Sequence, residues 1–351
     1  MPVTTDILTT VESRVGRIRL NRPKAIHALT RDMCTAMIEA LLEWRRDSAV
    51  DAMMLDHAEG RGFCAGGDVV MLAKSGASDG AEARAFFHEE YRLNHLLFTY
   101  AKPTVAFMDG ITMGGGVGIS QPCRFRIATE NTRFAMPETA IGLFPDVGGG
   151  WYLSRLPGRV GYFLALTGAR LDGAECLRLG LATHYVESLS LDDLKARIAA
   201  EPDRIEALLA EHATPPPPAR IEERLADIDR LFASNDYEEV LAALRDEPSE
   251  WAQAQLESLA CKSPQACKVS LRMLYDGALM IDFAEEMRQE YAVATRVVQR
   301  PDFVEGVRAL LVDKDNQPAW DPSSPEAVTT RMLDRIFAPM PAGEEWTPLR
   351  L

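Results

Sequence analysis

Two glycine-rich stretches of this chain could place backbone N–H groups against a ligand. They are GRGFCAGGD at residues 60–68 and MGGGVG at 113–118, and each leads toward a predicted helix. Glycine lets the main chain approach a ligand closely, with successive N–H groups pointing at it. Two such donors on one carbonyl oxygen would stabilise the oxyanion of thioester hydrolysis, where one donor is worth roughly 10²–10³ in rate. The same glycines could instead serve only tight turns.

Two acids lie in an apolar segment, FAMPETAIGLFPDV at 134–147. An acid in such surroundings costs desolvation energy unless it is paired or functional, and its pKa rises. Glu138 is therefore a candidate general base for water or a carboxylate nucleophile, with Asp146 as a second acid. The structural alternatives are a surface acid at a strand end for Glu138 and a helix N-cap ahead of Gly148 for Asp146.

A nucleophilic cysteine is a rival hypothesis. GFCAG at 62–66 matches Gly-x-nucleophile-x-Gly, and His184 lies downstream of Asp146 as a possible base. Such an elbow needs a strand that runs straight into the nucleophile, whereas 58–61 is expected to be a loop, so Cys64 is also explained as a small buried residue. Nucleotide sites are disfavoured, because Ile119 replaces the last glycine of Gly-x-Gly-x-x-Gly and no Walker lysine follows the loops.

The scaffold expected around these residues repeats strand, glycine loop and helix, which is typical of α/β layering. Thr30 is predicted to cap a helix, and a turn ending in Gly16 is predicted to separate two short strands within 7–21. Further strands are expected at 50–57, 104–110 and 125–130, an extended piece at 134–138, and a helix at 81–99.

The second half of the chain is predicted to be mainly helical. Asp172 and Glu175 are predicted to form a capping box, and Ser263 is predicted to cap a helix. Four consecutive prolines, Pro215 to Pro218, cannot continue a helix and favour an extended spacer. We therefore divide the chain into a core at 1–213, a proline-rich linker at 214–219 and a helical region at 220–351.

Composition narrows the function classes. The 351 residues contain 52 acids against 38 bases, for a net charge of −14, which disfavours nucleic acid as a partner. Six scattered cysteines and six scattered histidines form neither a disulfide framework nor a metal motif, so no metal is expected. No apolar run approaches the ~18–20 residues of a membrane span, and no targeting segment is recognised, so a cytoplasmic protein is expected.

These motifs resemble those of a known superfamily. FCAGGD at 63–68 is similar to the first oxyanion loop of the crotonase (enoyl-CoA hydratase/isomerase) superfamily, and GITMGGGVGIS at 110–120 to its second. Within it, four segments resemble the 3-hydroxyisobutyryl-CoA hydrolases: HEEYRLN at 88–94, MPETAIGLFPDVGGG at 136–150, GYFLALTGARL at 161–171 and DFVEGVRALLVDKDNQPAW at 302–320. The resemblance implies an α/β fold with a crotonase-like ββα superhelix core and a mostly helical C-terminal region.

The resemblance also implies roles for individual residues. Glu138 would be the main acid/base or nucleophile, and Asp146 would position water or the substrate hydroxyl. Glu90 would line the acyl pocket. The oxyanion donors would be the N–H groups of Gly67 and Gly115. Lys24 to Ile26, and so Lys24 and Ala25, would lie near the coenzyme A moiety, and Ala65 and Gly66 would also bind the substrate.

The implied activity is hydrolysis of a short 3-hydroxyacyl-CoA thioester in valine breakdown, with no cofactor beyond the coenzyme A of the substrate. Hydratases of the superfamily carry a second glutamate where this chain has Gly118, which argues against a hydratase. An enoyl-CoA hydratase or isomerase acting on short acyl-CoAs remains the alternative within the same fold. His27 stands where the family usually has asparagine, and it is interpreted either as a packed core residue, which we favour, or as a neighbour of the coenzyme A tunnel. A non-catalytic acyl-CoA binding module is a further alternative, and a homo-oligomer is possible.

Overall fold

The computed structural model describes residues 4–350, which form two compact units. Unit 1 comprises 1–67, 92–135 and 170–221, and unit 2 comprises 68–91, 136–169 and 222–351. The units therefore alternate along the chain, and the division passes through the single helix α3 (Ala81–Phe98). The division of the chain into 1–213, 214–219 and 220–351 stays a prediction. Residues 213–219 lie outside any helix or strand, as expected of a proline-rich linker.

Unit 1 contains a six-stranded sheet in the order β1-β2-β3-β5-β7-β9. β1 and β2 form an antiparallel hairpin, and all other neighbours are parallel. Gly16 was expected to end the hairpin turn, but it lies inside β2 opposite Val11, and Ser13 makes the turn with φ 56°. The strands are β1 (Ile7–Glu12), β2 (Val15–Leu20), β3 (Ala52–His57), β5 (Thr104–Met108), β7 (Phe125–Ala128) and β9 (His184–Tyr185).

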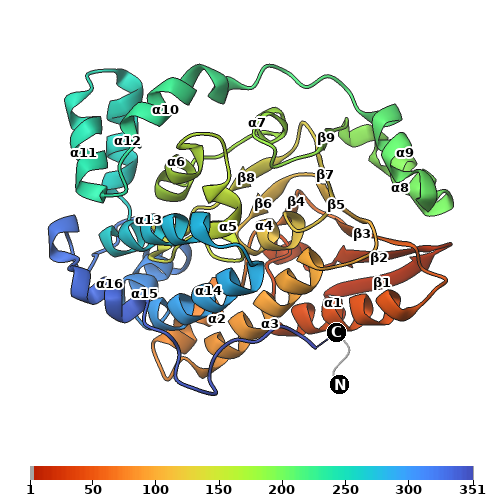
Figure 1. Cartoon of the computed structure of the whole chain (residues 1–351), viewed down its shortest axis with the longest axis horizontal. Coiled ribbons are helices and arrows are strands. Elements are labelled where there is room, and N and C mark those ends of the chain that lie inside the picture. Colours follow the sequence, from red (N-terminus) through yellow and green to blue (C-terminus); the bar gives the residue numbers. More distant parts are fainter. Residues whose placement is uncertain (1–3, 351) are drawn as a thin grey trace. The chain divides into compact units, whose positions relative to one another are not determined.

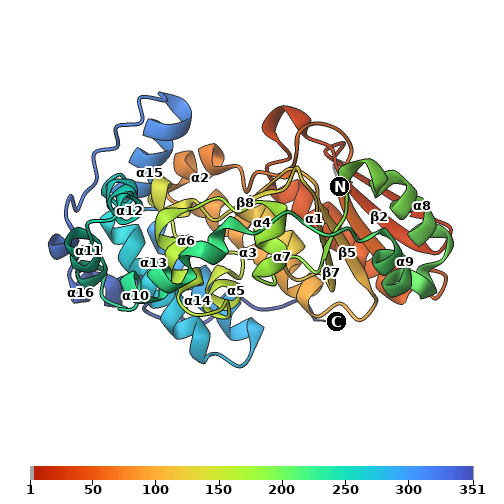
Figure 2. The same cartoon turned by 90° about the horizontal axis from the view of Figure 1, so that it is seen from above.

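Helices cover both faces of this sheet. Met54 and Phe107 lie on the face that shares a buried core with α8 (Leu191–Ala200) and α9 (Ile205–His212). Figure 2 shows these two helices beside the sheet. Gly16 points to the opposite face, where a Cβ would lie 2.3 Å from the ring of Trp44 on α1 (Arg31–Arg46). The Thr30 side chain accepts from the backbone N–H of Met33, which confirms the predicted cap.

A second, three-stranded sheet in unit 1 carries the glycine loops. Its order is β4 (Gly62–Cys64), β6 (Ile111–Met113) and β8 (Arg133–Ala135), and both pairings are parallel. Because parallel strands end at the same edge of a sheet, three loops leave from one place. These loops begin at residues 65, 114 and 136, so the topology gathers the segments with the candidate chemistry.

Unit 2 is helical. Its α13 (Pro264–Leu279) packs against α5 (Gly149–Ser154) and α6 (Val160–Thr167), as Figure 1 shows. Ser263 caps α13 as predicted, accepting from Ala266 N–H. The unit also contains α2 (Val69–Gly76), α10 (Leu225–Leu231), α11 (Tyr237–Asp246), α12 (Glu250–Ala260), α14 (Phe283–Val297), α15 (Pro301–Val307) and α16 (Thr330–Ile336).

Unit 1 also contains two short helices. α4 (Gly115–Ser120) begins at the second glycine loop, and α7 (Gly173–Arg178) carries the predicted Asp172–Glu175 capping box. None of the helices within residues 4–350 has the length and apolar character needed to cross a membrane. Over the same residues, no three His, Cys, Asp or Glu side chains gather as a metal site would require.

Candidate active site

The structure brings the two predicted oxyanion loops into contact within unit 1. A Cβ placed on Gly66 would lie 3.7 Å from Gly115 N, and one on Gly116 only 2.4 Å from the carbonyl oxygen of Cys64. A side chain at Gly116 would therefore hold the loops apart, whereas the Gly66 contact is of ordinary length and glycine is favoured there by its φ of 117°. The glycines do more than make turns, because they allow two backbones to pack directly against one another.

Both candidate donors lie where a backbone N–H is available. Gly115 is the first residue of α4, and the first N–H groups of a helix have no partner inside it. Gly114 before it has φ 47° and ψ −120°, a conformation that suits glycine. The first loop is held through Gly66, whose carbonyl oxygen accepts from Leu29 N–H at 2.7 Å, a bond that does not use the N–H of Gly67.

The predicted coenzyme A segment joins the same region of unit 1. Lys24 is exposed and Ala25 half-buried in a short 3₁₀ turn. Ile26, one residue further, accepts a hydrogen bond of 2.9 Å from Ala65 N–H. His27 is a packed residue as predicted, since it is 1% exposed and its ring nitrogens contact Arg22 N and Glu59 O at 2.9 Å.

Cys64 has the surroundings of a structural residue. It ends strand β4, is fully buried, and its thiol donates to the carbonyl oxygen of His27 at 3.3 Å. Residues 58–61 are a loop as predicted, and only the three residues of β4 lead into Cys64, whose thiol is not exposed as a nucleophile elbow requires. This geometry favours the packing role.

Three predicted acids are buried in unit 2. Glu90, Glu138 and Asp146 have exposed fractions of 2%, 6% and 5%. The surface position considered for Glu138 is therefore wrong: the residue begins a 3₁₀ turn behind Pro137 and is buried. The N-cap considered for Asp146 is also wrong, because Gly148 is the N-cap of α5 and the Asp146 carboxylate bonds elsewhere.

Burial sets the acid–base properties of these groups. Loss of solvent raises the pKa of Glu90 and of Glu138 well above the ordinary range, and the neighbouring charge of Asp146 raises both further. Burial also raises the pKa of Asp146, to about 6, against the lowering effect of a hydrogen bond from Tyr91. Within residues 4–350, Glu138 Oε2 and Glu90 Oε1 have no hydrogen-bond partner.

Sequence reasoning missed the groups that orient Asp146. Tyr91, on α3, donates its hydroxyl to Asp146 Oδ2 at 2.7 Å, and both groups are buried. Glu290, on α14, accepts Gly148 N–H at 2.8 and 3.0 Å. Val147, between Asp146 and Gly148, has φ 55°, which is unfavourable for a β-branched residue. The bonds from Tyr91 and to Glu290 therefore stabilise a strained turn. Glu286, one helical turn before Glu290, has a pKa raised to about 8 by burial.

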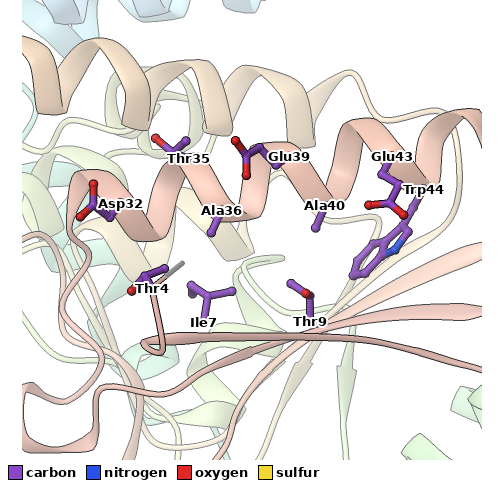
Figure 3. A pocket seen from close by; sticks show the side chains of 10 residues that line it. All are labelled: Thr4, Ile7, Thr9, Asp32, Thr35, Ala36, Glu39, Ala40, Glu43 and Trp44. Atoms are coloured by element: carbon purple, nitrogen blue, oxygen red, sulfur yellow. The ribbon is translucent and has the colours of Figure 1, made fainter. Parts of the chain in front are cut away.

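A separate hollow lies between β1 and α1 in unit 1 (Figure 3). It has a volume of about 300 Å³, and Asp32, Glu39 and Glu43 of α1 lie on its lining with Thr9 and Trp44. None of the predicted site residues lines it. This hollow is therefore separate from the glycine loops of unit 1, and it contains none of the buried acids of unit 2.

A family model described as "Enoyl-CoA hydratase/isomerase" matches residues 15–337. The chain belongs to the enoyl-CoA hydratase/isomerase family. The family match confirms the crotonase resemblance and the α/β fold expected from the sequence.

Relatives refine this family assignment. The chain is 42% identical to "3-hydroxyisobutyryl-CoA hydrolase, mitochondrial" of Danio rerio, covering 95% of this chain and 89% of that one. It is 41% identical to "Probable 3-hydroxyisobutyryl-CoA hydrolase 2" of Arabidopsis thaliana, covering 98% and 94%. The sequence resemblance to these hydrolases is thus confirmed over nearly the whole chain.

Solved structures share the fold over the same extent. A carnitinyl-CoA dehydratase from Mycobacterium thermoresistibile has 42% identity and a TM-score of 0.93, covering 98% of this chain and 99% of that one. An enoyl-CoA hydratase from Rhodobacter sphaeroides has 37% identity and a TM-score of 0.91, covering 98% and 100%. All four names describe enzymes that act on coenzyme A thioesters, but they divide between hydrolysis and the addition or removal of water.

Proposed function

We propose that this chain hydrolyses a short 3-hydroxyacyl-CoA thioester, with 3-hydroxyisobutyryl-CoA as the substrate to which the hydrolase relatives point. The observation that carries the proposal is the arrangement of the three-stranded sheet. Strands β4, β6 and β8 are parallel neighbours, so the first oxyanion loop, the second oxyanion loop and the segment with Glu138 all leave from one edge.

Chain connectivity supports a common reaction centre. Glu138 follows the end of β8 by three residues, and three extended residues span at most about 10–11 Å. The glutamate therefore stays near the sheet edge from which the loops with Gly67 and Gly115 depart. In the proposed mechanism the two N–H groups bind the thioester oxygen, and they bind it most tightly when it carries the negative charge of the tetrahedral intermediate.

Glu138 is proposed to drive the attack. As a general base, its carboxylate takes a proton from water, the hydroxide adds to the carbonyl carbon, and the carbon–sulfur bond breaks to release coenzyme A, which takes up a proton. As a nucleophile, the same carboxylate adds to the carbonyl carbon and the carbon–sulfur bond breaks to release coenzyme A. Water then hydrolyses the resulting mixed anhydride, which frees the hydroxy acid and regenerates the Glu138 carboxylate. A buried position supports both routes, since a raised pKa makes the ionised Glu138 a stronger base.

Glu90 and Asp146 are proposed to hold the 3-hydroxyl or to orient the water. Asp146, with a pKa of about 6, is mostly ionised at neutral pH and accepts hydrogen bonds. Burial and the charges of Asp146 and Glu138 raise the pKa of Glu90 well above its usual range, and its Oε1, which has no partner within residues 4–350, is placed to bond to the hydroxyl or the water.

Hydration of an enoyl-CoA is the second candidate, favoured by the names of the two solved structures. The sequence resemblance assigns that chemistry two carboxylates, one of them at position 118. Gly118 is buried within α4 and offers no side chain there. This feature supports hydrolysis over hydration.

The wider setting is also proposed. The product 3-hydroxyisobutyrate would place the enzyme in valine breakdown, with no cofactor beyond the coenzyme A of its substrate and a homo-oligomer possible. We propose a cytoplasmic location, although the Danio rerio relative is named mitochondrial. Fractionation of cells that express the tagged full chain tests the location.

A thiol-release assay tests the activity. The purified chain is incubated with 3-hydroxyisobutyryl-CoA, isobutyryl-CoA and crotonyl-CoA, and free coenzyme A is measured with a thiol reagent. Release from the first substrate is expected; consumption of crotonyl-CoA without free thiol would support the hydratase instead. Glu138→Gln should lower thiol release by roughly 10²–10⁴ at unchanged fold, because it removes the base at constant shape. Near-normal turnover of this variant would exclude Glu138 as the reactive group.

A further inference from the structure

Asn94 is a buried polar residue that the mechanism above does not use. Its side chain is fully buried in the last third of α3, and neither Nδ2 nor Oδ1 has a hydrogen-bond partner in residues 4–350. A buried amide atom left without a partner costs roughly 1–3 kcal/mol. The other amide buried in unit 1, Gln121, instead donates to the carbonyl oxygen of Leu181 at 3.0 Å. Burial of the Asn94 amide therefore destabilises the folded chain, and no group within residues 4–350 offsets this cost with a hydrogen bond.

The position of Asn94 on its helix connects it to the candidate site. Glu90 and Asn94 are four residues apart on one uninterrupted helix, so they share a face and lie about 6 Å apart along the axis. Glu90 has Glu138 and Asp146 as its electrostatic neighbours, and its Oε1 also lacks a partner. Three unpartnered polar atoms therefore lie on adjacent turns of one buried helix face.

The chemistry of the amide selects the kind of ligand group it would bind. A carboxamide both donates and accepts, and a hydroxyl does the same, so each satisfies the other. A plain acyl chain satisfies neither amide atom. A site built to bind a hydroxyl rejects the analogue that lacks it, because its own polar groups are then left unpaired.

We propose that Asn94 is a specificity-determining residue that binds the 3-hydroxyl of the acyl group, beside Glu90. The inference rests on the proposed function for the identity of the substrate. It assigns selection for the hydroxyl to α3, and it adds to the predicted pocket residue Glu90 a neutral group that keeps its hydrogen-bonding capacity at every pH.

Binding measurements test this without requiring turnover. In a Glu138→Gln background, the dissociation constants of 3-hydroxyisobutyryl-CoA and isobutyryl-CoA are measured by calorimetry. The hydroxylated ligand is expected to bind more tightly, and Asn94→Leu should reduce that preference by roughly 10-fold to 100-fold through weaker binding of the hydroxylated ligand alone. Asn94→Asp, which retains an acceptor, should keep part of the preference.

A matched variant separates recognition from packing. Gln121→Leu removes a buried amide that has a protein partner, so it should lower the melting temperature and leave the ligand preference unchanged. Asn94→Leu should leave the melting temperature unchanged or raise it, since it removes an unsatisfied amide. An unaltered preference in Asn94→Leu, or an equal loss for both ligands, overturns the inference even when the wild-type chain releases thiol. If the wild-type chain releases no thiol, but the Glu138→Gln chain prefers the hydroxylated ligand and Asn94→Leu reduces that preference, only the proposed hydrolysis is contradicted.

Discussion

The hydrogen bond from Tyr91 to Asp146 should control the charge of Asp146 near neutral pH. The bond is 2.7 Å long and buried at both ends. A hydrogen bond to a charged acceptor contributes roughly 1.5–3 kcal/mol. Since one pKa unit corresponds to about 1.36 kcal/mol, Tyr91→Phe should raise the pKa of Asp146 by about one to two units, from about 6 toward 7–8.

The effect on stability has a definite sign. The pKa of Asp146 is raised in the folded state, from 3.8 to about 6, so the folded chain binds more protons than the unfolded chain in that interval. Its contribution to the free energy of unfolding therefore falls as pH rises through this window. Tyr91→Phe extends the window upward, so the variant should lose most stability, about 1.5–3 kcal/mol, above pH ~8 and much less below pH ~5.

Two assays check this reasoning. The first follows the carboxyl resonances of ¹³C-labelled aspartate against pH, with Asp146→Asn identifying the signal of Asp146. The second compares thermal unfolding of the wild type and Tyr91→Phe from pH 5 to 9. Tyr100→Phe is the control, because Tyr100 donates to the neutral carbonyl oxygen of Leu41 at 3.0 Å and its loss should not depend on pH. An Asp146 titration that does not move in Tyr91→Phe would refute the argument.

Substitutions at Gly115, Glu290 and Gly116 test other parts of the site. Gly115→Pro removes the proposed donor N–H at the first position of α4, where proline is compatible with a helix; thiol release should fall by roughly 10²–10³, and full activity in a folded variant would rule out this donor. Glu290→Leu should lower turnover more than Glu290→Gln, because the glutamine oxygen can still accept from Gly148 N–H, and equal losses would argue against a positioning role. Gly116→Ala should lower the free energy of unfolding by about 1–3 kcal/mol and reduce activity, because the new Cβ separates the two loops. Gly180→Ala is the control: its Cβ meets nothing within 4 Å, so it should lower the free energy of unfolding by about 1–2 kcal/mol through its positive φ and leave turnover intact. Thermal unfolding and thiol release together distinguish these outcomes.

Local sequence signals predicted much of the scaffold. Thr30 and Ser263 are caps because a side-chain oxygen ahead of a periodic apolar stretch has a local partner, the N–H three residues on. The helix expected at 81–99 is α3. The turn predicted to end at Gly16 was wrong. Glycine is typical of turns, but here the missing side chain leaves room for the ring of Trp44, which lies far along the sequence.

The surroundings of the acids could not be predicted in the same way. Glu286 and Glu290 lie in the polar sequence AEEMRQE, which is typical of a solvated helix face. Both are buried in the structure, and Glu290 is tied to Gly148 from the other half of the chain. The role of Tyr91 likewise depends on its hydrogen bond to Asp146, which is distant in the sequence. Such burial depends on long-range packing, for which a single sequence gives no local signal.

The alternating division of the chain has a consequence for synthesis on the ribosome. Segments 68–91 and 136–169 emerge early, yet they belong to a unit whose remaining residues begin at 222. Glu290 must be translated before it can brace Gly148, and Trp346 before its indole can donate to the carbonyl oxygen of His88, two residues from Glu90. The nascent polypeptide would therefore carry its acids unassembled until translation is nearly finished, and premature termination would yield a product with glycine loops but no organised acid cluster.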